Sequence, residues 1–171
     1  MKSVYNIHST FEIEYDTIRK IVDEFDTPDG VERFDITNNN RFTITAVPDD
    51  SVQVGRYTPT ANIRGTIMTR NIEVGVENEG DGLWSGYDDE EKEYEEVEYV
   101  AFKGKEEKVI KNESLRYQMF LLMEELALNS DYGFLKGLIS DGNIVKPVFI
   151  KDGEYVDSTI DIVKNHGDNN W

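Results

Sequence analysis

The chain has 171 residues and a formal net charge of −17, with 38% hydrophobic and 11% aromatic residues. This apolar content excludes a globally disordered chain, because it is enough to build a core. The chain has no cysteine, which excludes disulfides and thiolate metal sites. The negative charge opposes direct binding to nucleic acid or to an anionic membrane, since phosphate contacts need Lys and Arg.

We expect a single α+β domain over residues 1–166, followed by a polar tail at 167–171. No signal-peptide pattern begins the chain. The longest apolar run, residues 119–123, has five residues, whereas a helix needs about 20 to span a bilayer. These features predict a soluble, cytoplasmic protein.

The first predicted helix covers residues 17–25, where apolar side chains recur at helical spacing. Asp16 is the expected N-cap, because its carboxylate can accept hydrogen bonds from the free amides of the first turn. Residues 11–15 alternate with a period of two, which indicates either a strand or an earlier start of the helix.

The middle of the chain predicts an antiparallel meander of about five strands. Segments rich in β-branched and aromatic residues, separated by short turns, occur at residues 33–37, 41–47, 51–57, 61–69 and 72–76. The asparagines between the first two segments tolerate positive φ, which favours a hairpin there.

The strongest helix signal lies at residues 114–129, which are apolar on two sides. We therefore expect a long apolar helix packed on one face of the sheet. After it come a short helix or turn at 132–139, a strand at 143–150, a possible returning strand at 154–156 and a weak helix at 158–164.

Charge is concentrated in one segment. Between Glu77 and Glu98 there are eleven acids and one base, Lys92, so this segment carries −10 of the net charge. Its conformation is ambiguous, although β-branched and aromatic residues favour a strand near residues 97–102, with an acidic loop before it. Locally concentrated charge makes a directional field and therefore indicates a recognition surface.

No catalytic motif is recognisable. Only two histidines, His8 and His166, are present, and no serine lies in a nucleophile-elbow pattern. The acidic segment offers oxygen ligands for calcium but lacks EF-hand spacing. We expect no catalytic residues, no cofactor and no specific metal site; a carboxylate- or metal-dependent enzyme stays as an alternative.

Carboxylates on a strand can approximate the charge and spacing of a phosphate track. In type, though not in any residue motif, the chain resembles the acidic nucleic-acid mimics that many phages and mobile elements encode against defence enzymes. The expected function is therefore inhibition of a basic, nucleic-acid-binding enzyme. The expected contact residues are Asp88, Asp89, Glu90, Glu91, Glu93, Glu95, Glu96 and Glu98, with Tyr87, Tyr94 and Tyr99 as aromatic anchors. A phage-like assembly subunit with a solvated acidic loop is the alternative, and a homodimer is compatible with either function.

Overall fold

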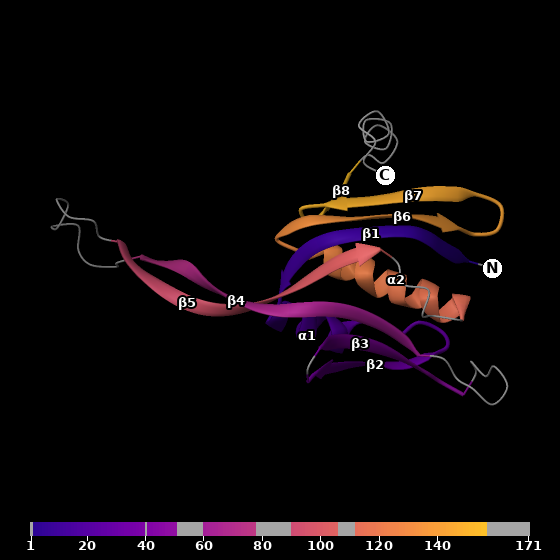
Figure 1. The fold of residues 1–171 in the computed structure, drawn as a ribbon, viewed down its shortest axis with the longest axis horizontal. Helices are drawn as coiled ribbons and strands as arrows, with labels where there is room; N and C mark the ends of the chain where they lie inside the picture. Colours follow the sequence, from indigo (N-terminus) through magenta and orange to yellow (C-terminus); the bar gives the residue numbers. More distant parts are fainter. Residues whose placement is uncertain (1, 40, 51–59, 78–89, 106–111, 157–171) are drawn as a thin grey trace.

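The computed structural model describes residues 2–39, 41–50, 60–77, 90–105 and 112–156. Within them, eight antiparallel strands form one sheet in the order β2-β3-β4-β5-β1-β6-β7-β8 (Figure 1). The strands are β1 (Ser3–Glu14), β2 (Val31–Asn38), β3 (Phe42–Pro48), β4 (Ala61–Glu77), β5 (Glu90–Lys105), β6 (Tyr132–Ser140), β7 (Val145–Lys151) and β8 (Glu154–Tyr155). The helices are α1 (Tyr15–Glu24) and α2 (Glu113–Leu128).

Strand β1 lies in the middle of the sheet, between β5 and β6. Helix α1 follows β1 and leads to the edge strand β2, whereas α2 connects β5 to β6 and so crosses over β1. Both helices contribute to one core and contact each other, so they cover the same face of the sheet. We call that face the inner face and the other the open face.

The core lies between the inner face and the two helices. Phe11 on β1 is directly opposite Phe102 on β5, and their ring centroids are 5.0 Å apart. Phe42 on β3 meets Phe102 edge-on at 6.1 Å. Residues alternate along these strands between this core and the open face, as expected for a sheet that is covered on one side.

The predicted arrangement, a meander of about five strands with one long apolar helix on it, is wrong. The sheet has eight strands, and two short helices of 10 and 16 residues take the place of the long helix. The segment that predicted this helix is helical, but it ends at Leu128 after 16 residues. The helix predicted at residues 17–25 is present, with observed bounds of 15–24, and the hairpin of β2 and β3 is confirmed.

Two segments differ from their predicted structures. Residues 132–139 form strand β6 instead of a helix or turn. The two strands predicted at 61–69 and 72–76 are one strand, β4. The segments predicted at 51–57 and 158–164, and the tail at 167–171, lie outside the described residues.

Strands β4 and β5 continue beyond the rest of the sheet as a two-stranded arm (Figure 1). Pairing of β3 with β4 ends at Gly65, and pairing of β1 with β5 begins at Tyr99. The nine registered pairs from Thr69/Glu98 to Glu77/Glu90 therefore have no third strand beside them in the described part of the chain. We call these pairs the arm; at about 3.3 Å per residue it is about 30 Å long.

Candidate partner-binding arm and root groove

The arm divides the acidic residues between its two faces, because successive side chains on a strand point to opposite sides. Glu93 and Glu95 lie on the open face, in register with Val74 and Ile72 of β4. The opposite face, which continues the inner face of the sheet, carries a separate set of polar and aromatic residues. That set comprises Tyr94, Glu96 and Glu98 of β5 and Glu73, Asn71 and Thr69 of β4.

The arm presents apolar side chains to solvent on both faces. Tyr94 is 72% exposed and Val74 is 37% exposed. A two-stranded ribbon has no layer behind it to cover such groups, and isolated ribbons of this kind are marginal in water. Exposed aromatic residues among charges are typical of protein-binding surfaces.

The exposed carboxylates of β5 on the arm have no intramolecular counter-ion among the described side chains. The described ion pairs are Arg33–Glu32, Arg33–Asp35 and Arg70–Glu12. None involves the four exposed acids of β5, which are Glu93, Glu95, Glu96 and Glu98. Their charge is therefore directed to solvent.

The structure places the predicted contact residues in three groups. The first group lies outside the described residues and comprises Asp88, Asp89 and Tyr87. The side chains of Glu90 and Glu91 belong to the same group, although their backbone is part of β5. The acidic loop predicted before residues 97–102 is thus part of strand β5 from Glu90 onward. The second group is the four exposed glutamates with Tyr94, and the third is Tyr99 alone, half-buried at the root of the arm.

A groove of about 360 Å³ lies at the root of the arm, where the arm passes the start of α1. Its lining is mostly acidic and comes from β5, the end of β1, the start of α1 and one residue of β4. We call it the root groove; it is lined by Glu14, Tyr15, Asp16, Thr69, Glu95, Glu96, Val97 and Glu98.

The sequence did not indicate the part that Glu14 and Asp16 play in this groove. Asp16 was the expected N-cap, but the structure places Glu14 at that position, and its side chain makes no capping hydrogen bond. Both carboxylates therefore add negative charge beside Glu96 and Glu98, about 80 residues further along the chain. Nothing local in the sequence links these two segments; only the pairing of β1 with β5 does so.

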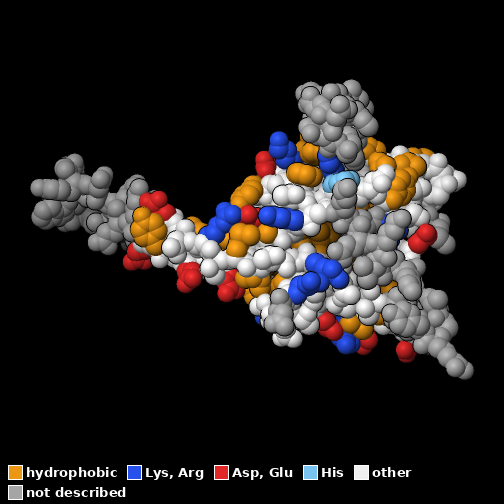
Figure 2. All heavy atoms as spheres, viewed as in Figure 1, with side chains coloured by type: hydrophobic (Ala, Val, Ile, Leu, Met, Phe, Trp, Pro, Cys, Tyr) orange, Lys and Arg blue, Asp and Glu red, His pale blue; other side chains and the backbone are white. Residues whose placement is uncertain are grey.

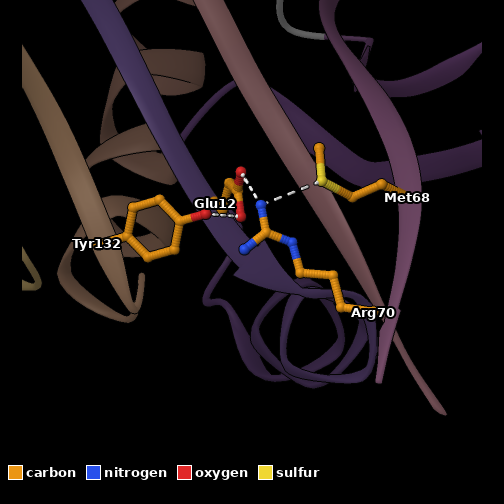
Figure 3. A network of polar contacts seen from close by, with 4 residues as sticks. All are labelled: Glu12, Met68, Arg70 and Tyr132. Carbon is orange, nitrogen blue, oxygen red and sulfur yellow. Dashed lines mark hydrogen bonds and ion pairs between the residues drawn. The ribbon is translucent and has the colours of Figure 1, made fainter. Parts of the chain in front are cut away.

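A polar network on the open face holds the root of the arm (Figure 3). Arg70 Nη2 donates to Glu12 Oε1 at 2.8 Å, and the Tyr132 hydroxyl donates to the other oxygen of the same carboxylate. The guanidinium also lies 5.8 Å from the Tyr99 ring centroid and 5.7 Å from that of Tyr132. These contacts connect β4, β1, β6 and β5 at the point where the arm leaves the body.

The two tyrosines of this network stay protonated at neutral pH. Burial raises the pKa of the Tyr99 phenol, and the nearby Asp131 and Glu14 raise it further, against the opposing effect of Arg70. The hydrogen bond to Glu12 raises the pKa of Tyr132. Tyr132 therefore acts as a hydrogen-bond donor to a carboxylate at physiological pH.

The body carries charges of both signs. Figure 2 shows Asp and Glu side chains along the arm, and both Lys or Arg and Asp or Glu side chains over the body. On the open face, a hollow of about 210 Å³ lies between β4 and β5. We call it the basic hollow; it is lined by Arg64, Gly65, Thr66, Met68, Ala101 and Lys103.

Two further observations concern membranes and metals. None of the described helices is both long and apolar enough to cross a membrane. Within the described ranges, no group of three or more His, Asp or Glu side chains is placed to hold a metal ion.

The full chain, residues 1–171, matches the model of a family of unknown function, DUF7110, and the chain belongs to this family. Searches of curated proteins and of solved structures give no match.

Proposed function

We propose that this protein is a non-enzymatic binding protein that presents the arm and the root groove to a basic protein partner. The observation that carries this proposal is the set of four exposed arm glutamates that have no counter-ion among the described side chains. Unneutralised charge on a projecting element attracts cationic partners and raises their association rate.

The root groove supports recognition of a basic side chain. Glu14, Asp16, Glu96 and Glu98 surround a space of about 360 Å³, which is large enough for the end of an arginine or lysine side chain. A guanidinium or ammonium group there would meet carboxylates from several directions, and such charge-assisted hydrogen bonds are stronger than neutral ones. Tyr94, on the same face as Glu96, supplies an exposed aromatic contact beside it.

We further propose that the partner is a nucleic-acid-binding enzyme whose basic groove receives the arm. Carboxylates on one face of a strand repeat at about 6.8 Å, which is twice the rise per residue. Phosphates on one DNA strand advance by about 3.4 Å per nucleotide. Glu96 and Glu98 share one face, and Glu93 and Glu95 the other, so a narrow groove around the arm would meet charge on both sides.

The test uses two variants with equal changes in net charge. In the first, Glu93, Glu95, Glu96 and Glu98 are all changed to Gln. In the control, four exposed acids at and after the end of α1 are neutralised: Asp23→Asn, Glu24→Gln, Asp26→Asn and Asp29→Asn. Each protein is immobilised and exposed to the heparin-binding fraction of a host extract, with and without competing duplex DNA.

We expect the wild type and the control to retain a protein that duplex DNA displaces, and whose DNA-binding or nuclease activity the free wild type inhibits. The arm variant should bind this protein at least about tenfold more weakly, because four charges near the contact are lost. Affinity should also fall as salt increases. Equal binding by the arm and control variants, or capture that duplex DNA does not affect, would refute the proposal.

A further inference from the structure

The open face of β4 and β5 has charge of opposite sign at its two ends. Glu93 and Glu95 lie on the arm, at one end. Arg64 and Lys103, both exposed, flank the basic hollow at the other end. This polarity runs along one ribbon and on one face, so it is a property of a single continuous surface.

Between the two ends the same face is largely apolar. Registered pairs place Ile72, Val97, Met68, Tyr99 and Ala101 on it, in order from the arm to the hollow. Arg70, which is paired with Val97, lies within this stretch, and its charge is compensated by the ion pair with Glu12. Along its length, the open face of β4 and β5 is therefore acidic on the arm, largely apolar in the middle and basic at the hollow.

Such a face is complementary to itself when one copy is reversed. If two copies lie open face to open face, related by a two-fold axis at the Met68–Tyr99 pair, the acidic end of each meets the basic end of the other. On β5, Glu95 and Lys103 are each four positions from Tyr99, in opposite directions. The two-fold axis therefore places Glu95 of one copy over Lys103 of the other. Two-fold contacts of this kind use the same patch twice and close after two copies.

We infer that this protein forms a two-fold dimer in which the acidic arm of each copy lies over the basic hollow of the other. The occupant of the hollow is thus the arm of a second copy, and the apolar middle of the face is buried at the axis. The dimer does not depend on the proposed function, and a partner whose groove encloses both faces of the arm has to displace the second copy. The dimer covers the arm face with Glu93 and Glu95 and leaves the face with Tyr94, Glu96 and Glu98 accessible to another partner.

Charge exchange tests the contact directly. One variant carries Arg64→Glu and Lys103→Glu in the hollow, and the other carries Glu93→Lys and Glu95→Lys on the arm. Each variant alone has like charges at both ends, so neither should dimerise; an equimolar mixture restores opposite charges at both contacts. The control is Lys20→Glu with Glu24→Lys, at two exposed positions on α1.

Sedimentation equilibrium at low salt gives the readout, with circular dichroism confirming that each variant is folded. We expect dimers for the wild type, the control and the mixture, and monomers for each variant alone, with a dissociation constant at least about tenfold larger at 0.5 M salt. A monomeric wild type, dimers of either variant alone, or a mixture that stays monomeric would overturn the proposal. Open-ended assemblies would also overturn it, because the two-fold contact closes.

Cysteine cross-linking fixes the register, and the chain has no native cysteine to interfere. Met68→Cys places a thiol at the proposed axis and should form a disulfide between two identical copies. Glu95→Cys and Lys103→Cys, in separate copies, should cross-link when mixed but much less when each is alone. Cross-linking of Lys20→Cys to the same extent would show that the disulfides form by random collision and would contradict the register.

Discussion

At the scale of single residues, the close pairing of β6 with β1 depends on Gly133, which lies opposite Phe11. Its φ is +108°, and a Cβ built on it would lie 2.2 Å from the carbonyl oxygen of Thr10 and 2.4 Å from the Cα of Phe11. Both obstacles are backbone atoms of the central strand and cannot rotate away. Gly104 has a similar φ of +121° but no atom within 4 Å of a built Cβ. Alanine substitutions at the two glycines therefore distinguish the cost of a strained backbone from the cost of a steric clash.

We predict that Gly104→Ala costs about 1–2 kcal/mol of unfolding free energy, because alanine is strained at positive φ. Gly133→Ala should cost about 3 kcal/mol or more, since overpacking adds to the same strain. Urea unfolding of both variants measures the difference. Equal losses would mean that β1 and β6 separate easily at this point.

Glu12 shows how a half-buried carboxylate holds the root of the arm. Its side chain is 14% exposed and accepts from both Arg70 and Tyr132, whereas the Arg33–Asp35 pair is about half exposed on each side. We predict that Glu12→Gln costs about 1–2 kcal/mol, because charge-assisted bonds at a shielded carboxylate are lost. Asp35→Asn should cost about 0.5 kcal/mol or less. Thermal unfolding of the two variants gives the comparison, and equal small effects would contradict the role assigned to Glu12.

At the scale of elements, helix α2 carries an acid where its dipole disfavours one. Glu124 lies in the second half of α2, and burial raises the pKa of its carboxyl above its ordinary value, against the hydrogen bond from Tyr155. Burial and the charge of Glu124 also raise the pKa of Tyr155 to about 12, so the tyrosine stays a donor. A negative charge near a helix C-terminus is unfavourable.

We predict that Glu124→Gln stabilises the protein by about 0.5–1 kcal/mol at pH 7. Because the folded pKa is raised, the carboxyl favours folding only while it is protonated, and this advantage is lost as pH rises through the folded pKa. The gain from the variant should therefore disappear at pH 4, below the ordinary value of 4.5. Glu113→Gln, at the other end of the helix, is the matched control and should give no gain at pH 7. Urea unfolding at both pH values tests this, and a gain independent of pH would contradict it.

The arm should be dispensable for folding. The described core residues lie on the body, and none falls between residues 71 and 96. Replacing residues 71–96 with Asn-Gly joins Arg70 to Val97, which are paired across the two strands, by a common hairpin turn. We predict a melting temperature within a few degrees of the wild type, together with loss of partner capture. A large drop in melting temperature would show that the arm is part of the cooperative fold.

At the scale of the whole molecule, the sequence predicted local features better than their arrangement. The apolar stripe of α1 was predicted from the periodicity of its residues, and the hairpin of β2 and β3 from the residues of its turn. Strand β6 was missed because it is a central strand with buried residues on both faces: Leu135, Lys136 and Gly137 are buried in succession, which removes the alternation. The first half of β1 was missed because a register shift between Tyr5 and His8, next to Asn6 at positive φ, interrupts its pattern.

The candidate site was predictable only in part. The concentration of charge identified the glutamates of β5, but their division between two faces required the pairing register with β4. Strand β4 appeared as two strands because its polar middle, Arg70 and Asn71, lies where the arm leaves the body and has no core to face. The root groove and the basic hollow combine segments far apart in the sequence, so no local pattern could reveal them.

The edges of the arm pair with no third strand in the described part of the chain, and this gives the arm glutamates a second role. A ribbon with no neighbouring strand offers its outward amides and carbonyls to any other extended chain, and proteins commonly block such addition with charge. The carboxylates along β5 thus act as gatekeepers against strand-by-strand polymerisation. Replacing these carboxylates with neutral side chains would remove this protection, and ribbons from different molecules would then be free to pair edge to edge.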